Sequence, residues 1–186
     1  PEGNRTYSGK TVYINPAVAG LAKKMKMPIA LYRIEGGYGM EPRWSNVTRR
    51  GRMKAYVHRV IEPEDYASMT NQELYEQICD GLFVDEGVAD GCFRSSERAE
   101  YLERAYYVCP KCGLSSFHSE GNTFHCEKCG MGGTYDPDLQ IRGDFPFATT
   151  LEWYDYQASY INSLDVTTMT EEPLYQDTAN VTKVIV

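Results

Sequence analysis

Apolar positions recur along the chain with two different periods, and together these periods predict a mixture of helices and strands. After Asn15-Pro16, where Asn can cap a helix that begins at Pro, apolar side chains recur every three or four residues, at Val18, Leu21, Ala22 and Met25. The apolar run 29–34 then predicts a buried strand, and the segment 53–61 alternates as a second strand. A turn, a helix and a buried strand in this order predict part of an α/β layer fold.

Two further helices are predicted from their first turns. Thr-Asn-Gln-Glu at 70–73 and Thr-Thr-Leu-Glu at 149–152 are capping boxes, in which Thr and Glu each accept a hydrogen bond from the other's backbone N–H group. The first of these helices is expected to end near Phe83. The second is rich in aromatic residues, namely Trp153, Tyr154, Tyr156 and Tyr160. An additional helix is expected over 95–105, leading into a cysteine-rich segment.

Four of the six cysteines have the spacing of a metal site: Cys109, Cys112, Cys126 and Cys129. They form two C-x2-C pairs separated by 13 residues, which lets four thiolates surround one Zn²⁺ tetrahedrally. Gly113 and Gly130 directly follow the pairs, where a left-handed turn aims backbone N–H groups at the sulfurs. The segment 119–122 is expected to be a hairpin tip. The pattern therefore predicts a zinc ribbon.

A zinc ribbon is favoured over two other roles for the same cysteines. Disulfides would require an oxidising compartment, for which nothing else in the sequence argues, and a rubredoxin-like iron site is less favoured still. His118 and His125 lie nearby, but a complete set of four thiolates does not need them, so we interpret them as surface residues. Four protein ligands leave no position for water, so the zinc is expected to be structural. Few basic residues lie between the pairs and their surroundings are acidic, which disfavours nucleic-acid binding.

The net charge of −7 conceals an asymmetry along the chain. Residues 1–60 contain twelve Lys and Arg against three Glu, whereas residues 61–186 contain seven basic against 23 acidic residues. The basic first third suggests a phosphate-bearing substrate, an anionic membrane surface or nucleic acid as its counterpart, with an ordinary solvated surface as the alternative. The cations expected to face a membrane are Lys23, Lys24, Lys26, Arg49, Arg50 and Arg52.

The first residues form a candidate phosphate-binding loop. The chain begins with Pro-Glu-Gly-Asn-Arg, without an initiator Met, and residues 180–186 have the pattern of a strand, so we expect a piece of a longer protein. In an α/β fold, the loop Glu2-Gly3-Asn4-Arg5 would follow a strand, where such folds bind ligands. Arg can hold a phosphate bidentately, Gly admits the backbone, and Glu can orient the Arg. A plain surface turn is the alternative interpretation.

This loop resembles a motif of glycerolipid acyltransferases, specifically of the 1-acylglycerol-3-phosphate O-acyltransferase family. Pro1-Glu2-Gly3-Asn4-Arg5-Thr6 with Gly9 is similar to the block F-P-E-G-T-R-S, which in that family binds the phosphate of the acyl acceptor. The segment 99–104, which precedes the four cysteines, resembles the corresponding segment of a bacterial variety of the family that carries an inserted zinc ribbon. The resemblance covers most of residues 1–160, and further similar blocks follow in the family's order at 27–34, 36–39, 43–44, 49–52 and 73–75.

The resemblance implies an enzyme of phospholipid biosynthesis. Such an enzyme moves an acyl group from acyl-CoA or acyl carrier protein to the 2-hydroxyl of 1-acylglycerol-3-phosphate (lysophosphatidate), which gives phosphatidate. It also implies a cytoplasmic protein that is peripheral at the inner face of the plasma membrane, in contact with anionic lipid. The residues implied to bind the acceptor phosphate are Glu2, Gly3, Asn4 and Arg5.

The chain departs from the family pattern at the catalytic motif. The family uses the His of an H-x4-D motif as the general base on the acceptor hydroxyl. The three histidines here have Pro63, Thr123 and Gly130 five positions on, so none begins such a motif. We therefore expect the catalytic motif upstream of Pro1 and no transfer activity in this chain alone. Asn4 and Thr6 stand where the family has Thr and Ser, which keeps the polarity of the loop.

These expectations divide the chain into an acyltransferase part, a helical connection, the zinc ribbon and a C-terminal helix with the start of a further segment, over 1–62, 63–107, 108–143 and 144–186. A function of a different class stays open beside the enzyme. In this alternative the chain is a non-catalytic zinc-ribbon adaptor that binds a protein partner.

Overall fold

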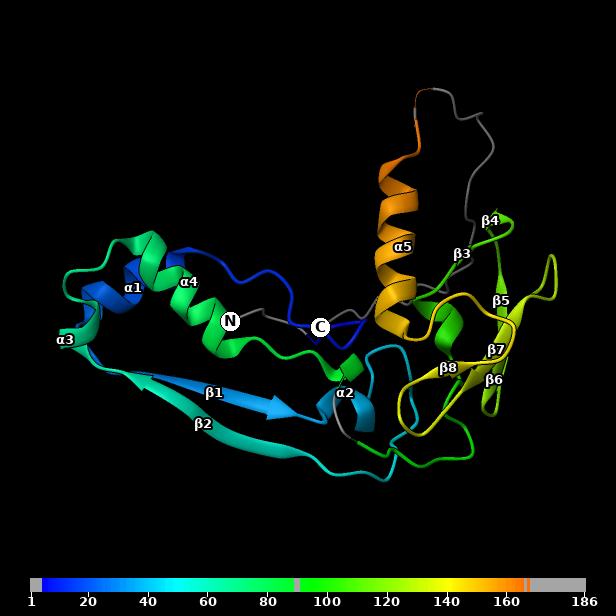
Figure 1. The fold of residues 1–186 in the computed structure, drawn as a ribbon, viewed down its shortest axis with the longest axis horizontal. Coiled ribbons are helices and arrows are strands. Elements are labelled where there is room, and N and C mark those ends of the chain that lie inside the picture. The colour runs from blue at the N-terminus through cyan, green and yellow to red at the C-terminus, as the bar shows by residue number, and fades with distance from the viewer. Residues whose placement is uncertain (1–4, 89–90, 166, 168–186) are drawn as a thin grey trace, which may run out of the picture.

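The computed structural model describes residues 5–88, 91–165 and 167. Its elements form two neighbouring parts (Figure 1). In one part, helices α1 and α4 lie beside the two-stranded sheet of β1 and β2, and in the other the small strands β3 to β8 lie to one side of α5. The chain is thus a mixed α/β protein with small antiparallel sheets, as the sequence predicted in outline. The strand expected over 180–186 lies outside the described residues.

The first part packs two helices against one face of an antiparallel pair of strands. These elements are α1 (Ala17–Met25), β1 (Ile29–Glu35), β2 (Lys54–Ile61), α3 (Pro63–Tyr66) and α4 (Asn71–Leu82). The register of β1 on β2 shifts between Leu31 and Tyr32, which indicates a β-bulge. The buried core of this part consists of Ala19, Leu31, Ile61, Tyr66, Leu74 and Ile78.

Two burial predictions for this part are wrong. Helix α1 buries Ala19, whereas Leu21 and Met25, which were expected in its apolar stripe, are 59% and 57% exposed. In β1 only Leu31 is buried, while Tyr32 and Ile34 are more than half exposed. The reason is the narrow sheet. With two strands and helices against one face, side chains that point to the other face stay largely exposed.

Two predicted helix starts agree with the sequence, and the first is off by one residue. Helix α1 begins at Ala17 and has Pro16 as its N-cap residue, whereas Pro16 was expected as the first helical residue; the Asn15 side chain accepts a hydrogen bond from the Ala17 N–H at 2.9 Å. Both predicted capping boxes are present, at the first turn of α4 and at the first turn of α5 (Thr150–Asn162). None of the helices among the described residues is long and apolar enough to cross a bilayer.

The helix expected over 95–105 is wrong, because only the short 3-10 turn η2 (Leu102–Arg104) forms there. Two backbone donors of this segment bond instead to the tip of a hairpin distant in sequence. The Arg98 N–H donates to Asn122 Oδ1 at 3.0 Å, and the Ala99 N–H donates to the Gly121 carbonyl at 2.9 Å. Tertiary partners therefore replace the intrahelical bonds that the local pattern predicted.

The second part is organised around Trp153, which is fully buried in α5. Its ring lies 5.2 Å from that of Phe124 and 4.9 Å from that of Phe117, and its indole N–H donates to the Val108 carbonyl at 2.8 Å. The strands around it are β3 (Val108–Cys109), β4 (Gly113–Leu114), β5 (Phe117–Glu120), β6 (Thr123–Cys126), β7 (Gly132–Tyr135) and β8 (Ile141–Arg142). The last four form an antiparallel sheet in the order β5-β6-β7-β8.

The two parts are joined through α2 (Gly37–Met40), the loop after it and the turn η1 (Glu86–Val88). Arg49 in this loop is buried, with 1% of its surface exposed, and its guanidinium donates to the Arg98 carbonyl at 2.6 Å. The same group lies 5.1 Å from the ring centroids of both Trp44 and Tyr135. Arg49 was expected among the cations that face a membrane. That assignment is wrong, because the Arg49 side chain is buried in the core and does not reach the surface.

The buried amide of Gln157 provides a first test of how α5 is held. Its Oε1 accepts from the N–H groups of Tyr107 and Val108, and its Nε2 donates to the Ala105 carbonyl at 2.9 Å. We expect Gln157→Ala to lower the free energy of unfolding by about 2–4 kcal/mol, because three backbone groups lose their partner in the core. Urea denaturation measures the change. The exposed Gln72→Ala is the matched control and should stay within about 0.5 kcal/mol of the parent. Equal midpoints for the two variants would contradict this account of α5.

Candidate metal centre and ligand pocket

The four predicted cysteines come together in one cluster. The Sγ atoms of Cys109, Cys112, Cys126 and Cys129 all lie within 4.8 Å of one another, and those of Cys109 and Cys129 are 3.7 Å apart. A tetrahedral Zn²⁺ with bonds of about 2.3 Å places its sulfur ligands about 3.8 Å apart. All six cysteines of the chain are free thiols. The cluster is thus a candidate metal site whose donor set and spacing fit zinc in a ribbon-like module.

Local turns aim the backbone at these sulfurs. Gly113 and Gly130 have φ values of +72° and +75°, the left-handed conformation that the sequence predicted after each pair. Backbone N–H groups of Lys111 and Cys112 hydrogen-bond to the Cys109 sulfur. The backbone N–H groups of Lys128 and Cys129 hydrogen-bond to the Cys126 sulfur in the same way. Such bonds stabilise thiolate charge, which is what a metal-bound sulfur carries.

The thiols of the cluster differ in acidity. Desolvation raises the pKa of Cys126, but hydrogen bonds from the Ser115 hydroxyl and from the backbone of Cys129 and Lys128 outweigh it and bring the pKa to about 6. The hydrogen bond with the Cys129 thiol raises the pKa of Cys112 to about 12. Ionisation of Cys126 is thus favoured over that of Cys112, and a metal ion must displace the Cys112 proton in order to bind.

The cluster is part of the aromatic core rather than an appendage. Cys109 and Cys126 are buried and belong to the same core as Phe117, Phe124 and Trp153. Four protein ligands close a tetrahedral site and leave no position for a reacting water. The arrangement suits a structural ion that holds the two cysteine turns together beside α5.

Metal content tests this assignment directly. We expect one Zn²⁺ per chain, and we expect Cys112→Ser to lose most of it, because three thiolates bind zinc far more weakly than four. Elemental analysis after gel filtration gives the stoichiometry, and a strong chelator should lower the melting temperature of the parent. Cys92→Ser is the control, since Cys92 is exposed and outside the cluster. Full zinc content in Cys112→Ser would rule out the four-thiolate site.

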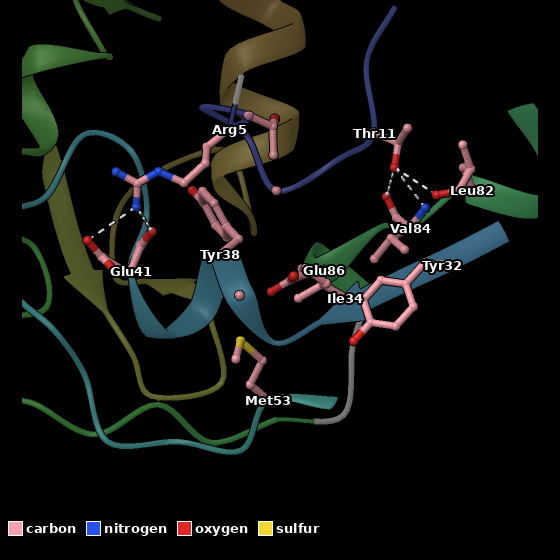
Figure 2. Close-up of a pocket in the computed structure, with 13 residues that line it drawn as sticks. Arg5, Thr11, Tyr32, Ile34, Tyr38, Glu41, Met53, Leu82, Val84 and Glu86 are labelled. Atoms are coloured by element: carbon pink, nitrogen blue, oxygen red, sulfur yellow. Dashed lines mark hydrogen bonds and ion pairs between the residues drawn. The ribbon is translucent and has the colours of Figure 1, made fainter. Parts of the chain in front are cut away.

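A separate cavity of about 500 Å³ lies where α2, the end of β1 and the first loop meet. Figure 2 shows Arg5 and Glu41 at one end of this pocket and Tyr32 and Val84 at the other. Its walls are mostly apolar, formed by Tyr32, Ile34, Tyr38, Met53, Leu82 and Val84. The pocket therefore combines a charged end with apolar walls.

Of the residues predicted to bind a phosphate, the structure describes only Arg5, and it places Arg5 at this pocket. Arg5 Nη1 lies 3.3 Å from Glu41 Oε1 and donates to the Glu41 carbonyl at 3.2 Å, and both side chains are more than half exposed. The Arg5 carbonyl accepts from Arg43 Nη1 at 3.3 Å. Glu2, Gly3 and Asn4 lie outside the described residues.

Glu86 is a pocket residue that the sequence did not reveal. It is buried, and its Oε2 accepts from the Gly39 N–H at 3.0 Å, with further hydrogen bonds from backbone groups at the start of α2. Desolvation raises its pKa, and these hydrogen bonds oppose the rise without cancelling it. In the sequence, Glu86 stands in an Asp-Glu-Gly turn, and nothing local predicts that it reaches α2.

Tyr38 connects the pocket to the metal-binding part. It lines the pocket, while its hydroxyl lies 2.9 Å from Thr150 Oγ1 in the first turn of α5 and accepts from the Trp44 indole N–H at 3.2 Å. On the pocket side the ring packs on Gly9, whose φ is +90° and where an added Cβ would lie 2.9 Å from the Tyr38 ring. Gly9, which the resemblance included, is therefore required by close packing.

Comparison of the chain with protein-family models, with curated proteins and with solved structures gives no match. The resemblance to glycerolipid acyltransferases consequently rests on the sequence blocks alone. The geometry of the cysteine cluster and of the pocket has to be interpreted from its own chemistry.

The raised pKa of Glu86 predicts a dependence of stability on pH. The folded state favours the protonated carboxyl, so the contribution of Glu86 to stability is full below the ordinary pKa of 4.5 and is lost as pH rises through the raised value. Gln cannot ionise, so Glu86→Gln should gain stability relative to the parent as pH rises from about 5 to about 8. Urea denaturation across this range measures the difference.

Glu86→Ala is the companion variant. It removes the acceptor of the α2 backbone groups and should lower the free energy of unfolding by about 1–3 kcal/mol near pH 4.5, a loss that shrinks as pH rises because the contribution of Glu86 in the parent falls. A stability difference between parent and Glu86→Gln that does not change with pH would contradict the buried carboxyl.

Proposed function

We propose that this chain is part of a 1-acylglycerol-3-phosphate O-acyltransferase and that the pocket beside Arg5 binds the acyl acceptor. The parent enzyme would move an acyl group from acyl-CoA or acyl carrier protein to the 2-hydroxyl of lysophosphatidate. The single observation that carries the proposal is the position of Arg5, a residue of the resembling block, at the charged end of an apolar pocket.

The chemistry of the pocket suits a phosphate-bearing amphiphile. A guanidinium forms paired, charge-assisted hydrogen bonds with phosphate oxygens, and Arg5 is exposed enough to do so. The apolar walls offer Tyr32, Ile34 and Met53 to an acyl chain, and all three are more than half exposed to solvent. Burying such side chains under a hydrocarbon chain is favourable by about 25 cal/mol per Å². Lysophosphatidate has both a phosphate and an acyl chain.

Glu41 has a definable role in this scheme. It forms an ion pair with Arg5 on the exposed rim, where such a pair contributes about 0–1 kcal/mol and can give way to a stronger anion. A phosphate with two negative charges competes well for the same guanidinium. Glu41 then orients the Arg5 side chain before the acceptor binds. The sequence analysis had predicted this role for Glu2.

The proposal divides the reaction between this chain and the rest of the parent enzyme. The residues described here bind and orient the acceptor, and the chain contains no H-x4-D motif to act as general base. We therefore expect the chain to bind lysophosphatidate without acylating it. Peripheral contact with anionic lipid belongs to the same proposal. The cations available for it are Lys24, Lys26, Arg50 and Arg52, which are all exposed.

The packing of the ribbon favours an internal role for it over the adaptor alternative. Its aromatic residues share one core with Tyr38, Trp44 and Phe93 from the pocket side of the molecule. A ribbon whose core extends into the pocket wall is well suited to support the pocket. Zinc would then affect acceptor binding indirectly, by stabilising this shared core.

Binding of a short-chain lysophosphatidate by the zinc-loaded chain tests the proposal. Arg5→Ala should weaken binding by about 10- to 100-fold, the loss of one charge-assisted contact of roughly 1.5–3 kcal/mol. Arg5→Lys should restore part of the affinity, because a point charge cannot form the paired bonds. Isothermal titration calorimetry gives the dissociation constants.

Two controls separate phosphate recognition from general lipid binding. The matching monoacylglycerol, which has no phosphate, should bind parent and Arg5→Ala alike. Arg50→Ala removes an exposed cation that does not line the pocket and should leave the affinity unchanged. Equal affinity of parent and Arg5→Ala for lysophosphatidate would refute the assignment of the pocket.

A further inference from the structure

We propose that His118 and His125 form a second metal site, separate from the four cysteines, that takes one divalent ion of the Ni²⁺ or Cu²⁺ class. The two histidines are direct cross-strand partners on β5 and β6. Their ring centroids are 5.4 Å apart, and both side chains are exposed. The sequence pattern had left them as surplus surface residues beside the cysteine cluster.

The ring separation allows both imidazoles to bind the same ion. An imidazole nitrogen binds a first-row divalent metal at about 2.0–2.1 Å, so an ion between two rings spans roughly 4 Å from nitrogen to nitrogen. Rings whose centroids are 5.4 Å apart, with an angle of 59° between their planes, reach that arrangement by side-chain rotation alone. The backbone does not need to move.

The hairpin holds the two histidines in place before any ion binds. Directly opposed residues of an antiparallel pair have their Cβ atoms about 4.5–5.5 Å apart. The pairing of Phe117 with Cys126 and of Ser119 with Phe124 fixes the register on both sides of the histidine pair. On β7, the residue opposite His125 is Gly132, which has no side chain to cover the imidazole. The ordering cost of the chelate is therefore small.

This site is distinct from the cysteine cluster, although Cys126 follows His125 directly. Side chains alternate along a strand, and Phe117 and Cys126 point into the core while His118 and His125 point to solvent. Among the described residues, the four cysteines form the only group of three or more metal-binding side chains. The histidine pair thus offers two protein ligands, and water would complete the coordination of the ion.

The donor set indicates which ions the pair prefers. Neutral imidazole suits Ni²⁺, Cu²⁺ and Zn²⁺, and affinity rises toward Ni²⁺ and Cu²⁺ along the first row. Glu120 lies two residues from His118 on the same exposed face and adds a negative charge there. With water in the remaining positions, the ion exchanges readily, in contrast to zinc enclosed by four thiolates.

Titration of the zinc-loaded chain with Ni²⁺ tests the proposal, and the chain supplies its own control. His118→Asn and His125→Asn should each weaken Ni²⁺ binding by at least about tenfold. With one imidazole left, the ion loses its second protein ligand, which the hairpin holds at high effective concentration. The double variant should be little weaker than either single variant. His58→Asn should bind like the parent, since His58 lies on β2 in the other part of the molecule.

A direct readout in the parent protein keeps the test independent of how the variants fold. Paramagnetic Ni²⁺ should broaden the ring resonances of His118 and His125 at concentrations that leave those of His58 sharp. Zinc content, measured in parallel, should stay at one per chain. Equal broadening of all three histidines, an affinity that is unchanged in His118→Asn and His125→Asn, or displacement of zinc in step with Ni²⁺ binding would overturn the proposal.

Discussion

The contact between helix α5 and the segment 105–109 holds the metal-binding part of the molecule together. Trp153 and Gln157, one turn apart on the buried face of α5, bond to the backbone of Ala105, Tyr107 and Val108. The next residue along the chain is Cys109, the first metal ligand. Polar backbone in a core must be satisfied, and here one helix face supplies partners for four backbone groups of this segment.

The same helix face extends to the pocket at one end and to the metal turn at the other. Thr150 in its first turn lies beside the Tyr38 hydroxyl, and Tyr160 near its end packs on Gly113, where an added Cβ would lie 2.3 Å from the tyrosine oxygen. A metal ion at the cysteines would therefore stabilise the segment 105–109, to which α5 is hydrogen-bonded. In the proposed function, that stability reaches the acceptor pocket through Tyr38. The ribbon then needs no chemistry of its own to affect activity.

Two buried ionisable side chains, Arg49 and Glu86, hold α2 in place between the two parts. Arg49 and Glu86 approach α2 from different segments and bond to the same residue, Arg49 to the Gly39 carbonyl at 3.4 Å and Glu86 to the Gly39 N–H at 3.0 Å. A buried charge is costly unless it is hydrogen-bonded, and both groups find backbone partners. The short helix α2, which carries Tyr38 into the pocket wall, is thus fixed from both sides.

Features that depend on a few neighbouring residues were determined by the sequence alone. The capping boxes at Thr70 and Thr149, the left-handed glycines and the C-x2-C pairs all act over four residues or fewer, so their geometry follows from local chemistry. The cluster of four cysteines needed one long-range step, the pairing of the two turns, and their regular spacing predicts that step.

Tertiary structure decided what depends on partners far along the chain. The segment 95–105 is not a helix because the N–H groups of Arg98 and Ala99 bond to the hairpin tip at 121–122, and Arg49 is buried because Trp44 and Tyr135 enclose it. Glu86 belongs to the pocket only because α2, 47 residues earlier, presents its N–H groups there. The sequence records each residue's chemistry, but which of these groups become neighbours is determined by the packing of whole elements, and no local pattern encodes that packing.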